Sequence, residues 1–150
     1  MRYIDEIIVH CADTRPDQNI NAATIDRWHK ERHWDCIGYH YFVKLDGTIE
    51  HGRPIEKQGA HCWQRNRTTI GICYAGGAIR QNGKLIHCDT RTPEQIRALY
   101  QLIVTLAHAF PTITKVNGHN HYAAVDCPCF DAATEYQPVV DYIREHQYGG

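Results

Sequence analysis

Ile7-Ile8-Val9-His10 is the stretch of sequence around which the fold is predicted to form. Three β-branched residues in succession, followed by a polar side chain, are typical of a short buried strand. Side chains on the ends of strands are held more rigidly than side chains on loops. The histidine that closes this strand is therefore a candidate functional residue.

Further strands are expected at residues 39–45, 48–51, 70–74 and 113–116. Asp46-Gly47 lies between the first two of them and is a strong hairpin signal, and Asn82-Gly83 marks a second turn. Residues 52–69 are polar and rich in arginine. They predict a long loop, and long loops in compact domains are usually functional.

Helix signals alternate with these strands. Asn21 can cap a helix that runs to about Arg32. Residues 92–95 (TPEQ) form a capping box with proline at the first helical position, and the helix they open ends at Pro111. Residues 131–136 are expected to form one or two helical turns before Pro138 starts the last helix. The residues expected to share one face of each helix are Ile25, Trp28 and Arg32; Ile96, Leu99, Ile103, Leu106 and Phe110; and Val139, Tyr142 and Ile143. The order of elements predicts one α/β domain over residues 1–150, with a central mixed sheet flanked by about three helices.

The composition agrees with a single globular domain. The chain has 150 residues, of which 43% are hydrophobic and 22% charged, enough to bury a core without disulfides or metals. Sixteen basic and 17 acidic residues give a net charge of −1, which argues against a large surface for nucleic acid or for an anionic membrane. The longest apolar runs are too short to span a bilayer.

The seven cysteines are odd in number, and their spacing does not suggest a disulfide framework. Charged residues near the start of the chain occupy the place where a signal peptide carries its apolar run. We therefore expect synthesis in the cytoplasm, with thiols that are free or bound to a metal. Eleven histidines, an unusually high number, also favour a metal site.

Two histidines and one cysteine form a candidate zinc set. His10 ends the first strand, His119 follows the strand at 113–116 and the flexible Gly118, and Cys127 lies eight residues further on. Zinc in hydrolases usually takes three protein ligands and keeps a fourth position for water. The spacing by itself leaves other interpretations open, because such a histidine can be a hydrogen-bonded structural residue and such a cysteine a small buried side chain.

Five blocks of the sequence resemble, in the same order, the zinc-dependent N-acetylmuramoyl-L-alanine amidases of phage endolysins, which share a fold with peptidoglycan recognition proteins. The blocks are residues 8–11 (IVHC), 37–48 (IGYHYFVKLDGT), 59–61 (GAH), 69–73 (TIGIC) and 118–131 (GHNHYAAVDCPCFD). The resemblance implies that His10, His119 and Cys127 hold Zn²⁺. It makes Cys129 a buried thiol, and it leaves His121, which lies too close to Cys127 for the family spacing, as a weaker rival to His119.

The resemblance also implies roles around the metal. Tyr39 corresponds to a catalytic tyrosine that hydrogen-bonds the attacking water or the developing oxyanion; without the resemblance it would be a tyrosine packed on the sheet. His61 and Asn66 correspond to residues that face the substrate cleft, and Trp63 offers a stacking surface for sugar or peptide. For these three, a solvated or packed loop residue remains the alternative.

The implied reaction is hydrolysis of the amide bond between N-acetylmuramic acid and L-alanine in peptidoglycan. Zinc would polarise the carbonyl and supply hydroxide at neutral pH, since it lowers the pKa of bound water to about 7. Peptidoglycan or a muropeptide would be the partner, with no role for nucleic acid or membrane, and the chain is expected to be a monomer. A phage lysin that reaches the wall after release and a cytoplasmic recycling enzyme both fit.

Two positions depart from the family pattern. Val125 stands where many phage relatives have a lysine that helps to stabilise the transition state. Cys73, as in phage relatives, stands where recycling enzymes have a glutamate base. A peptidoglycan-binding module that holds zinc but turns over poorly is therefore an alternative. A structural zinc domain is another, with its fourth ligand from Cys11, His121 or Cys129.

Overall fold

The structure, a computed structural model, describes residues 1–147; the predicted domain boundary at 150 lies outside the described residues. A five-stranded sheet has the order β3-β2-β4-β1-β7 and a separate hairpin is formed by β5 and β6. The strands are β1 (Glu6–Cys11), β2 (Tyr41–Val43), β3 (Ile49–His51), β4 (Thr69–Tyr74), β5 (Ala78–Gln81), β6 (Lys84–His87) and β7 (Lys115–Gly118). The helices are α1 (Ala22–Glu31), α2 (Pro93–Ala109) and α3 (Ala132–Gln147), with short 3-10 turns η1 (Pro16–Gln18), η2 (Asn66–Thr68) and η3 (His119–His121). This confirms the predicted single α/β domain with a mixed sheet and three helices.

Strand β1 lies inside the sheet, with β4 on one side and β7 on the other, both parallel to it. All six of its residues are buried. A parallel strand covered on both faces needs apolar side chains facing both ways, which explains the continuous β-branched run. Strand β2 is parallel to β4, and β3 pairs with β2 in antiparallel fashion, so the hairpin predicted at Asp46-Gly47 is present.

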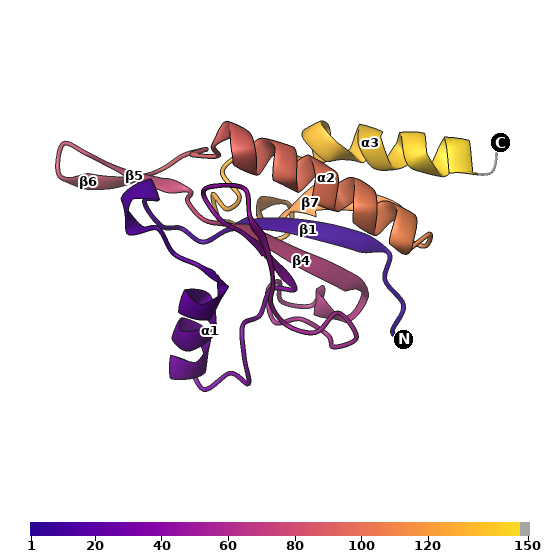
Figure 1. Ribbon diagram of the computed structural model, residues 1–150, viewed down its shortest axis with the longest axis horizontal. Helices are drawn as coiled ribbons and strands as arrows, with labels where there is room; N and C mark the ends of the chain where they lie inside the picture. Colours follow the sequence, from indigo (N-terminus) through magenta and orange to yellow (C-terminus); the bar gives the residue numbers. More distant parts are fainter. Residues whose placement is uncertain (148–150) are drawn as a thin grey trace.

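The two faces of the sheet are covered differently. Helices α2 and α3 lie side by side over one face, and α1 lies on the other side (Figure 1). The larger core lies under α2 and α3 and includes Ile7, Val9, Ile72 and Leu99. A smaller core under α1 contains Ile25, Ile37 and Phe42. Because side chains alternate along a strand, residues 6, 8 and 10 of β1 point away from the larger core.

The predicted starts of α1 and α2 are confirmed. Asn21 Oδ1 accepts a hydrogen bond of 2.9 Å from the backbone N–H of Thr24 at the start of α1. At α2, the hydroxyl of Thr92 accepts from the N–H of Gln95, and the Gln95 side chain accepts from the N–H of Thr92. Both capping boxes satisfy N–H groups that have no partner within the helix.

Three residues expected on the inward faces of helices lie on the surface. Ile96 and Tyr142 are exposed, as is Arg32 at the end of α1. In α2 the inward position is taken by Gln95, whose side-chain amide donates to the backbone oxygens of Val43 and Ala75. A buried amide is stable there because strand ends supply its acceptors. The other predicted positions Leu99, Ile103 and Leu106 are buried as expected.

The last helix is also longer than predicted. Pro138 lies inside α3, and the turns before and after it form one helix. Proline removes one backbone hydrogen bond, but Tyr136 and Val140 on either side of it are both buried in the larger core, which holds the two parts together. The turn at Asn82-Gly83 connects β5 and β6, two strands that were not predicted. The bounds of β2 and β7 differ from the predicted ones by two residues at each end, and the bounds of β1, β3 and β4 differ by one residue.

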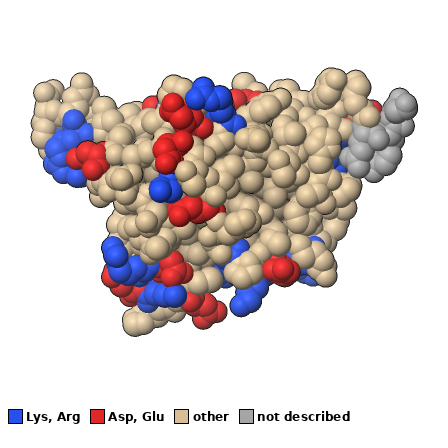
Figure 2. All heavy atoms as spheres, in the orientation of Figure 1, with Lys and Arg blue, Asp and Glu red and all other residues tan. Residues whose placement is uncertain are grey.

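All seven cysteines carry free thiols. Within residues 1–147, no helix has the length and apolar character needed to cross a bilayer. On the face drawn in Figure 2, basic and acidic side chains are interspersed among large uncharged areas, so no single sign of charge dominates that face.

Candidate metal centre and cleft

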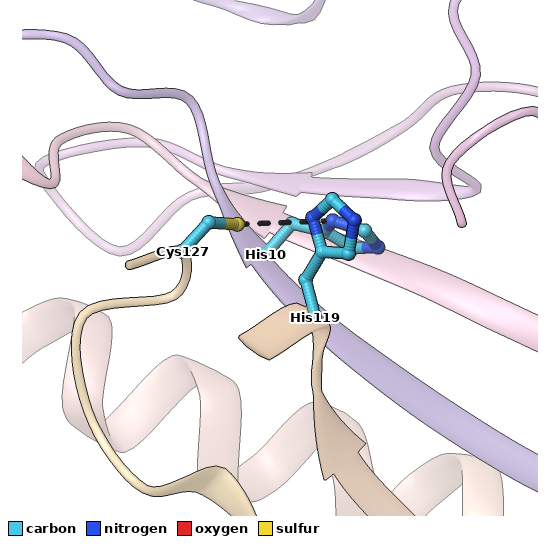
Figure 3. A group of neighbouring side chains, drawn as sticks. All are labelled: His10, His119 and Cys127. Atoms are coloured by element: carbon cyan, nitrogen blue, oxygen red, sulfur yellow. Dashed lines mark hydrogen bonds between the residues drawn. The ribbon is translucent and has the colours of Figure 1, made fainter. Parts of the chain in front are cut away.

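His10, His119 and Cys127 point toward one another (Figure 3). One potential ligand atom from each lies within 4.8 Å of the others. The Nδ1 atom of His10 is 3.8 Å from the sulfur of Cys127, and the rings of His10 and His119 have centroids 4.7 Å apart. The three residues of the predicted zinc set are thus brought together.

The parallel register of β1 and β7 explains how the two histidines meet. Val9 pairs with Gly118, so the next residues along the chain, His10 and His119, lie side by side where this pairing ends. His10 is only 1% exposed and belongs to β1, whereas His119 begins the 3-10 turn η3. Residues 109 positions apart therefore become neighbours through a single strand pairing.

Cys127 and the following Pro128 are held by contacts with residues of β1, β4 and β7. The N–H of Cys11 donates to the Cys127 sulfur at 3.2 Å, and the hydroxyl of Tyr74 donates to the carbonyl oxygen of Pro128 at 2.6 Å. A Cβ atom at Gly118 would lie 2.8 Å from Cδ of Pro128, so the loop approaches β7 where only glycine fits. These contacts fix the sulfur beside the end of β1.

The two rival ligands lie apart from this group. The Cys129 thiol donates to the carbonyl oxygen of Gly77 at 3.4 Å and lies 3.9 Å from the sulfur of Cys11. Burial raises the pKa of Cys129 to about 12, so this side chain stays a thiol rather than the thiolate that binds metals. His121 is exposed, with its ring against Tyr122. Among residues 1–147, no fourth His, Cys, Asp or Glu joins the group.

The three ligand atoms fit zinc. Tetrahedral Zn²⁺ with Zn–N of about 2.0–2.1 Å and Zn–S of about 2.3 Å places its ligand atoms roughly 3.3–3.6 Å apart, and small side-chain shifts would bring the group to those separations. Metal ligation requires neutral imidazoles. Burial lowers the pKa of both His10 and His119, which favours that form.

Tyr39 lies beside the group, as its predicted role requires. Its ring centroid is 5.0 Å from that of His10 and 5.6 Å from that of His29. Burial, together with the nearby cysteines, raises the pKa of the phenol well above its ordinary value. At neutral pH the hydroxyl is therefore protonated and can donate a hydrogen bond.

His61 and Asn66 both lie close to the metal ligands, but their polar atoms already have partners in the protein. The Nδ1 atom of His61 is 2.8 Å from Nε2 of His10, and its Nε2 atom is 3.2 Å from the hydroxyl of Thr69. The side-chain oxygen of Asn66 accepts from the backbone N–H groups of His61 and Cys62, at 2.9 Å each. Of the Asn66 amide, the nitrogen is the part left for a ligand.

A cleft runs past the metal group as two connected hollows. One, of about 420 Å³, is lined by His29, Arg32, Trp34, Tyr39, Ala60, His61, Cys62, Trp63, Asn66 and His119. The other, of about 360 Å³, is lined by Cys11, Ala12, Asp13, Tyr39, His87, His119, Val125, Asp126 and Cys127. Both contain Tyr39 and His119, so the hollows meet at the candidate site.

Sequence reasoning missed several residues that line the cleft. In the first hollow these are His29, Arg32 and Trp34, which lie in α1 or shortly after it. Trp63, which was predicted, lies on the 52–69 loop and is 83% exposed. The second hollow is also lined by Asp13 and His87, and an oxygen of the Asp13 carboxylate lies 2.7 Å from Nδ1 of His87. Only the tertiary arrangement reveals these positions, because neither helical nor strand periodicity marks them.

Comparisons with known proteins agree with this geometry. A family profile described as N-acetylmuramoyl-L-alanine amidase matches residues 1–130. The chain is 40% identical to the endolysin of Escherichia phage T7 over 128 residues, which are 85% of this chain and 82% of that protein. The endolysin of Klebsiella phage KP32 is 34% identical over 126 residues, covering 84% of this chain and 81% of that protein.

Solved structures show the same fold. The N-acetylmuramoyl-L-alanine amidase LysC from Clostridium intestinale superimposes with a TM-score of 0.75 and 28% identity, over 92% of this chain and 85% of that one. Drosophila PGRP-LB gives a TM-score of 0.71 over 90% of this chain and 80% of that one. At 23% identity the latter likeness concerns the fold alone.

Proposed function

Because the chain belongs to the N-acetylmuramoyl-L-alanine amidase family, we propose that it hydrolyses the amide bond between N-acetylmuramic acid and L-alanine in peptidoglycan, as a zinc-dependent enzyme. Its relatives from phages are named endolysins, which supports a role as a lytic enzyme of the cell wall. We further propose that it acts on the cell wall as a monomer.

The observation that carries this proposal is the group formed by His10, His119 and Cys127 at the meeting point of the two hollows. A set of two imidazoles and one thiolate is a sound catalytic zinc set, and three protein ligands leave room for water or substrate. A bound zinc ion would supply Lewis acidity toward the scissile carbonyl and a water of lowered pKa. The single thiolate would leave one net positive charge on the site.

Tyr39 is proposed to act on the substrate oxygen. Its protonated phenol next to His10 can donate a hydrogen bond to the oxyanion that develops at the scissile carbonyl. A preorganised donor of this kind in a site shielded from water typically contributes about 10²–10³ in rate. The same hydroxyl can orient the attacking water in the ground state.

The two hollows differ in charge, which suits a substrate with chemically different arms. Arg32, Trp34 and Trp63 give the first hollow a positive charge and aromatic surfaces. Asp13 and Asp126 line the second. We propose that Arg32, Trp34, Trp63 and Asn66, which line the first hollow, bind parts of the muropeptide.

The test is digestion of purified cell wall with and without a metal chelator. The proposal expects new L-alanine amino termini that disappear on chelation, about one zinc per chain, and a loss of roughly 10²-fold or more in rate for Tyr39→Phe with unchanged zinc content. Tyr39→Phe removes a hydroxyl and no ligand, so zinc content serves as its internal control.

The competing function is a binding module that holds zinc without turnover. Val125 and Cys73, at positions where the family resemblance implies polar catalytic helpers in other members, favour it. It forecasts wall binding without release of amino termini by the wild-type protein on any wall tested. Release that is sensitive to a chelator would exclude it.

A further inference from the structure

A chain of three hydrogen bonds leads away from the metal group into the protein. It joins Nε2 of His10 to Nδ1 of His61 at 2.8 Å, and Nε2 of His61 to the hydroxyl of Thr69 at 3.2 Å. The Thr69 hydroxyl in turn donates to the backbone carbonyl oxygen of Arg65 at 2.8 Å. Thr69 is fully buried at the start of β4, so the end of the chain is shielded from water.

The last member of the chain fixes the direction of every hydrogen bond in it. The carbonyl oxygen of Arg65 can only accept, so the hydroxyl proton of Thr69 points to it. The Thr69 oxygen then accepts from Nε2–H of His61. A neutral imidazole has one donor and one acceptor nitrogen. The Nδ1 atom of His61 is therefore an acceptor and receives Nε2–H of His10.

The direction of these hydrogen bonds determines which nitrogen of His10 is free to bind a metal. With its proton on Nε2, His10 presents the lone pair of Nδ1, and Nδ1 is the nitrogen that lies 3.8 Å from the sulfur of Cys127. If His61 carried its proton on Nδ1 instead, two N–H groups would face each other at 2.8 Å. His10 would then have to turn or to move its own proton to Nδ1, where no lone pair would remain for a metal.

We propose that His61 is a positioning residue, oriented by Thr69 and Arg65, that selects the metal-binding tautomer of His10. This inference rests on the proposed function in that zinc is the metal and His10 its ligand. It assigns His61 a role different from the substrate contact expected from the sequence, because both ring nitrogens of His61 are engaged by the protein. Partners of this kind behind a metal ligand typically change metal affinity by about 10–100-fold.

Thr69 offers the sharpest test, because two near-isosteric substitutions separate its hydroxyl from its packing. Thr69→Val keeps the branched shape and removes the hydroxyl, whereas Thr69→Ser keeps the hydroxyl. We expect zinc affinity, measured by competition with a chromogenic chelator, to fall roughly 10-fold in Thr69→Val and to stay within about twofold of wild type in Thr69→Ser.

His61 itself gives a second pair of variants. His61→Asn places an amide oxygen near the position of Nδ1 and can still accept from His10, whereas His61→Leu cannot. Zinc affinity should fall about 10–100-fold in His61→Leu and much less in His61→Asn. Trp63→Ala, in the same loop but exposed, is the control and should leave zinc affinity unchanged.

A measurement on the metal-free full-length protein keeps this inference separate from the proposed function. Imidazole ¹⁵N chemical shifts should show His10 and His61 as neutral, each with its proton on Nε2, and Thr69→Val should alter the pattern of His61. Suppose that the wild-type protein binds zinc and releases L-alanine termini. If Thr69→Val then matches Thr69→Ser in zinc affinity, or if His10 carries its proton on Nδ1, the positioning role is wrong and the proposed function stands. If the wild-type protein binds no zinc, both fail.

Discussion

A Cβ atom at Gly71 would lie 2.6 Å from both Cγ and Cδ2 of His61. The ring of His61 therefore lies directly on strand β4, in space that any larger residue at position 71 would fill. The N–H of Gly71 itself donates to Nδ1 of His40, so the same short stretch of strand supports two histidines. The glycine within the block at 69–73 thus has a packing role next to the candidate metal centre.

Gly71→Ala should weaken zinc binding and destabilise the fold together. The added methyl group must displace the His61 ring from Nε2 of His10, and overpacking of this kind costs about 1–3 kcal/mol. Urea unfolding of the chelated protein gives the change in unfolding free energy, and chelator competition gives the change in zinc affinity.

Ile72→Val is the matched control for Gly71→Ala. Ile72 lies on the same strand, in the larger core on the other face of the sheet, and its loss of one methylene costs about 0.5–1.5 kcal/mol. Zinc affinity should not change. An equal loss of affinity in both variants would mean that general destabilisation, and not the His61 ring, weakens the site.

The paired variants Cys127→Ser and Cys129→Ser test which sulfur is the ligand. Cys127→Ser should lose most of its zinc, because a hydroxyl is a far poorer zinc ligand than a thiolate. Cys129→Ser should keep its zinc, since that thiol contacts Gly77 and Cys11 instead. Metal analysis of the purified proteins decides, and the reverse result would mean that the ligand assignment is wrong by two residues.

The residues alone offered His10, His119 and Cys127 as a candidate set with other interpretations open, and the family resemblance selected it. The pairing of the strands explains why the two histidines are neighbours. A buried β-branched run identifies β1, and the glycine before His119 ends β7. Once the two strands pair in parallel, His10 and His119 must be neighbours. The helix starts at Asn21 and Thr92 were predicted because capping uses residues only three positions apart.

What the sequence did not predict depends on contacts between distant segments. Gln95 is buried only because carbonyl oxygens of Val43 and Ala75 accept from it, and no helical period indicates such partners. His29 is buried in α1 because its ring accepts a hydrogen bond from the N–H of Gly38. The engagement of both nitrogens of His61 likewise depends on β4 passing beneath the loop, so its position in the cleft was foreseen and its partners were not.

Acidification should lower the unfolding free energy of the chelated protein, and His40 should account for a measurable part of that loss. Burial lowers the pKa of His40 to about 4, against about 6.5 in the unfolded chain. Between pH 4 and pH 6.5, His40 is therefore protonated in the unfolded chain but neutral in the folded protein. The contribution of His40 is complete above about pH 6.5 and is lost as the pH falls toward 4; at pH 5 the loss is about 2 kcal/mol.

His40→Gln isolates this contribution, because an amide can still hydrogen-bond the N–H of Gly71 but does not titrate. We expect the drop in unfolding free energy between pH 7 and pH 5 to be about 2 kcal/mol smaller in the variant than in the wild type. Chelator must be present throughout, so that release of zinc in acid does not add to the effect. An identical drop in both proteins would show that His40 is not held neutral by the fold.

Val125→Lys should raise the rate of wall hydrolysis without loss of stability. Val125 is 43% exposed and lines the hollow that also contains Tyr39 and Cys127. A lysine there keeps its ammonium group in water, so the penalty for burying an unpaired charge does not arise. Its positive charge would stand close to the oxyanion that forms at the scissile carbonyl. A gain of about 10-fold in kcat is expected, below the 10²–10³ typical of a donor that evolved in place.

Val125→Met separates the charge of the new side chain from its size. Methionine lengthens the side chain without adding charge, and it should leave kcat near the wild-type value. The unfolding free energies of both variants should lie within about 0.5 kcal/mol of wild type, as for most surface substitutions. A gain that also appears in Val125→Met, or a marked loss of stability in Val125→Lys, would contradict the electrostatic argument. The first result would point to substrate packing in the cleft, and the second would mean that position 125 is not open to water when the protein is folded.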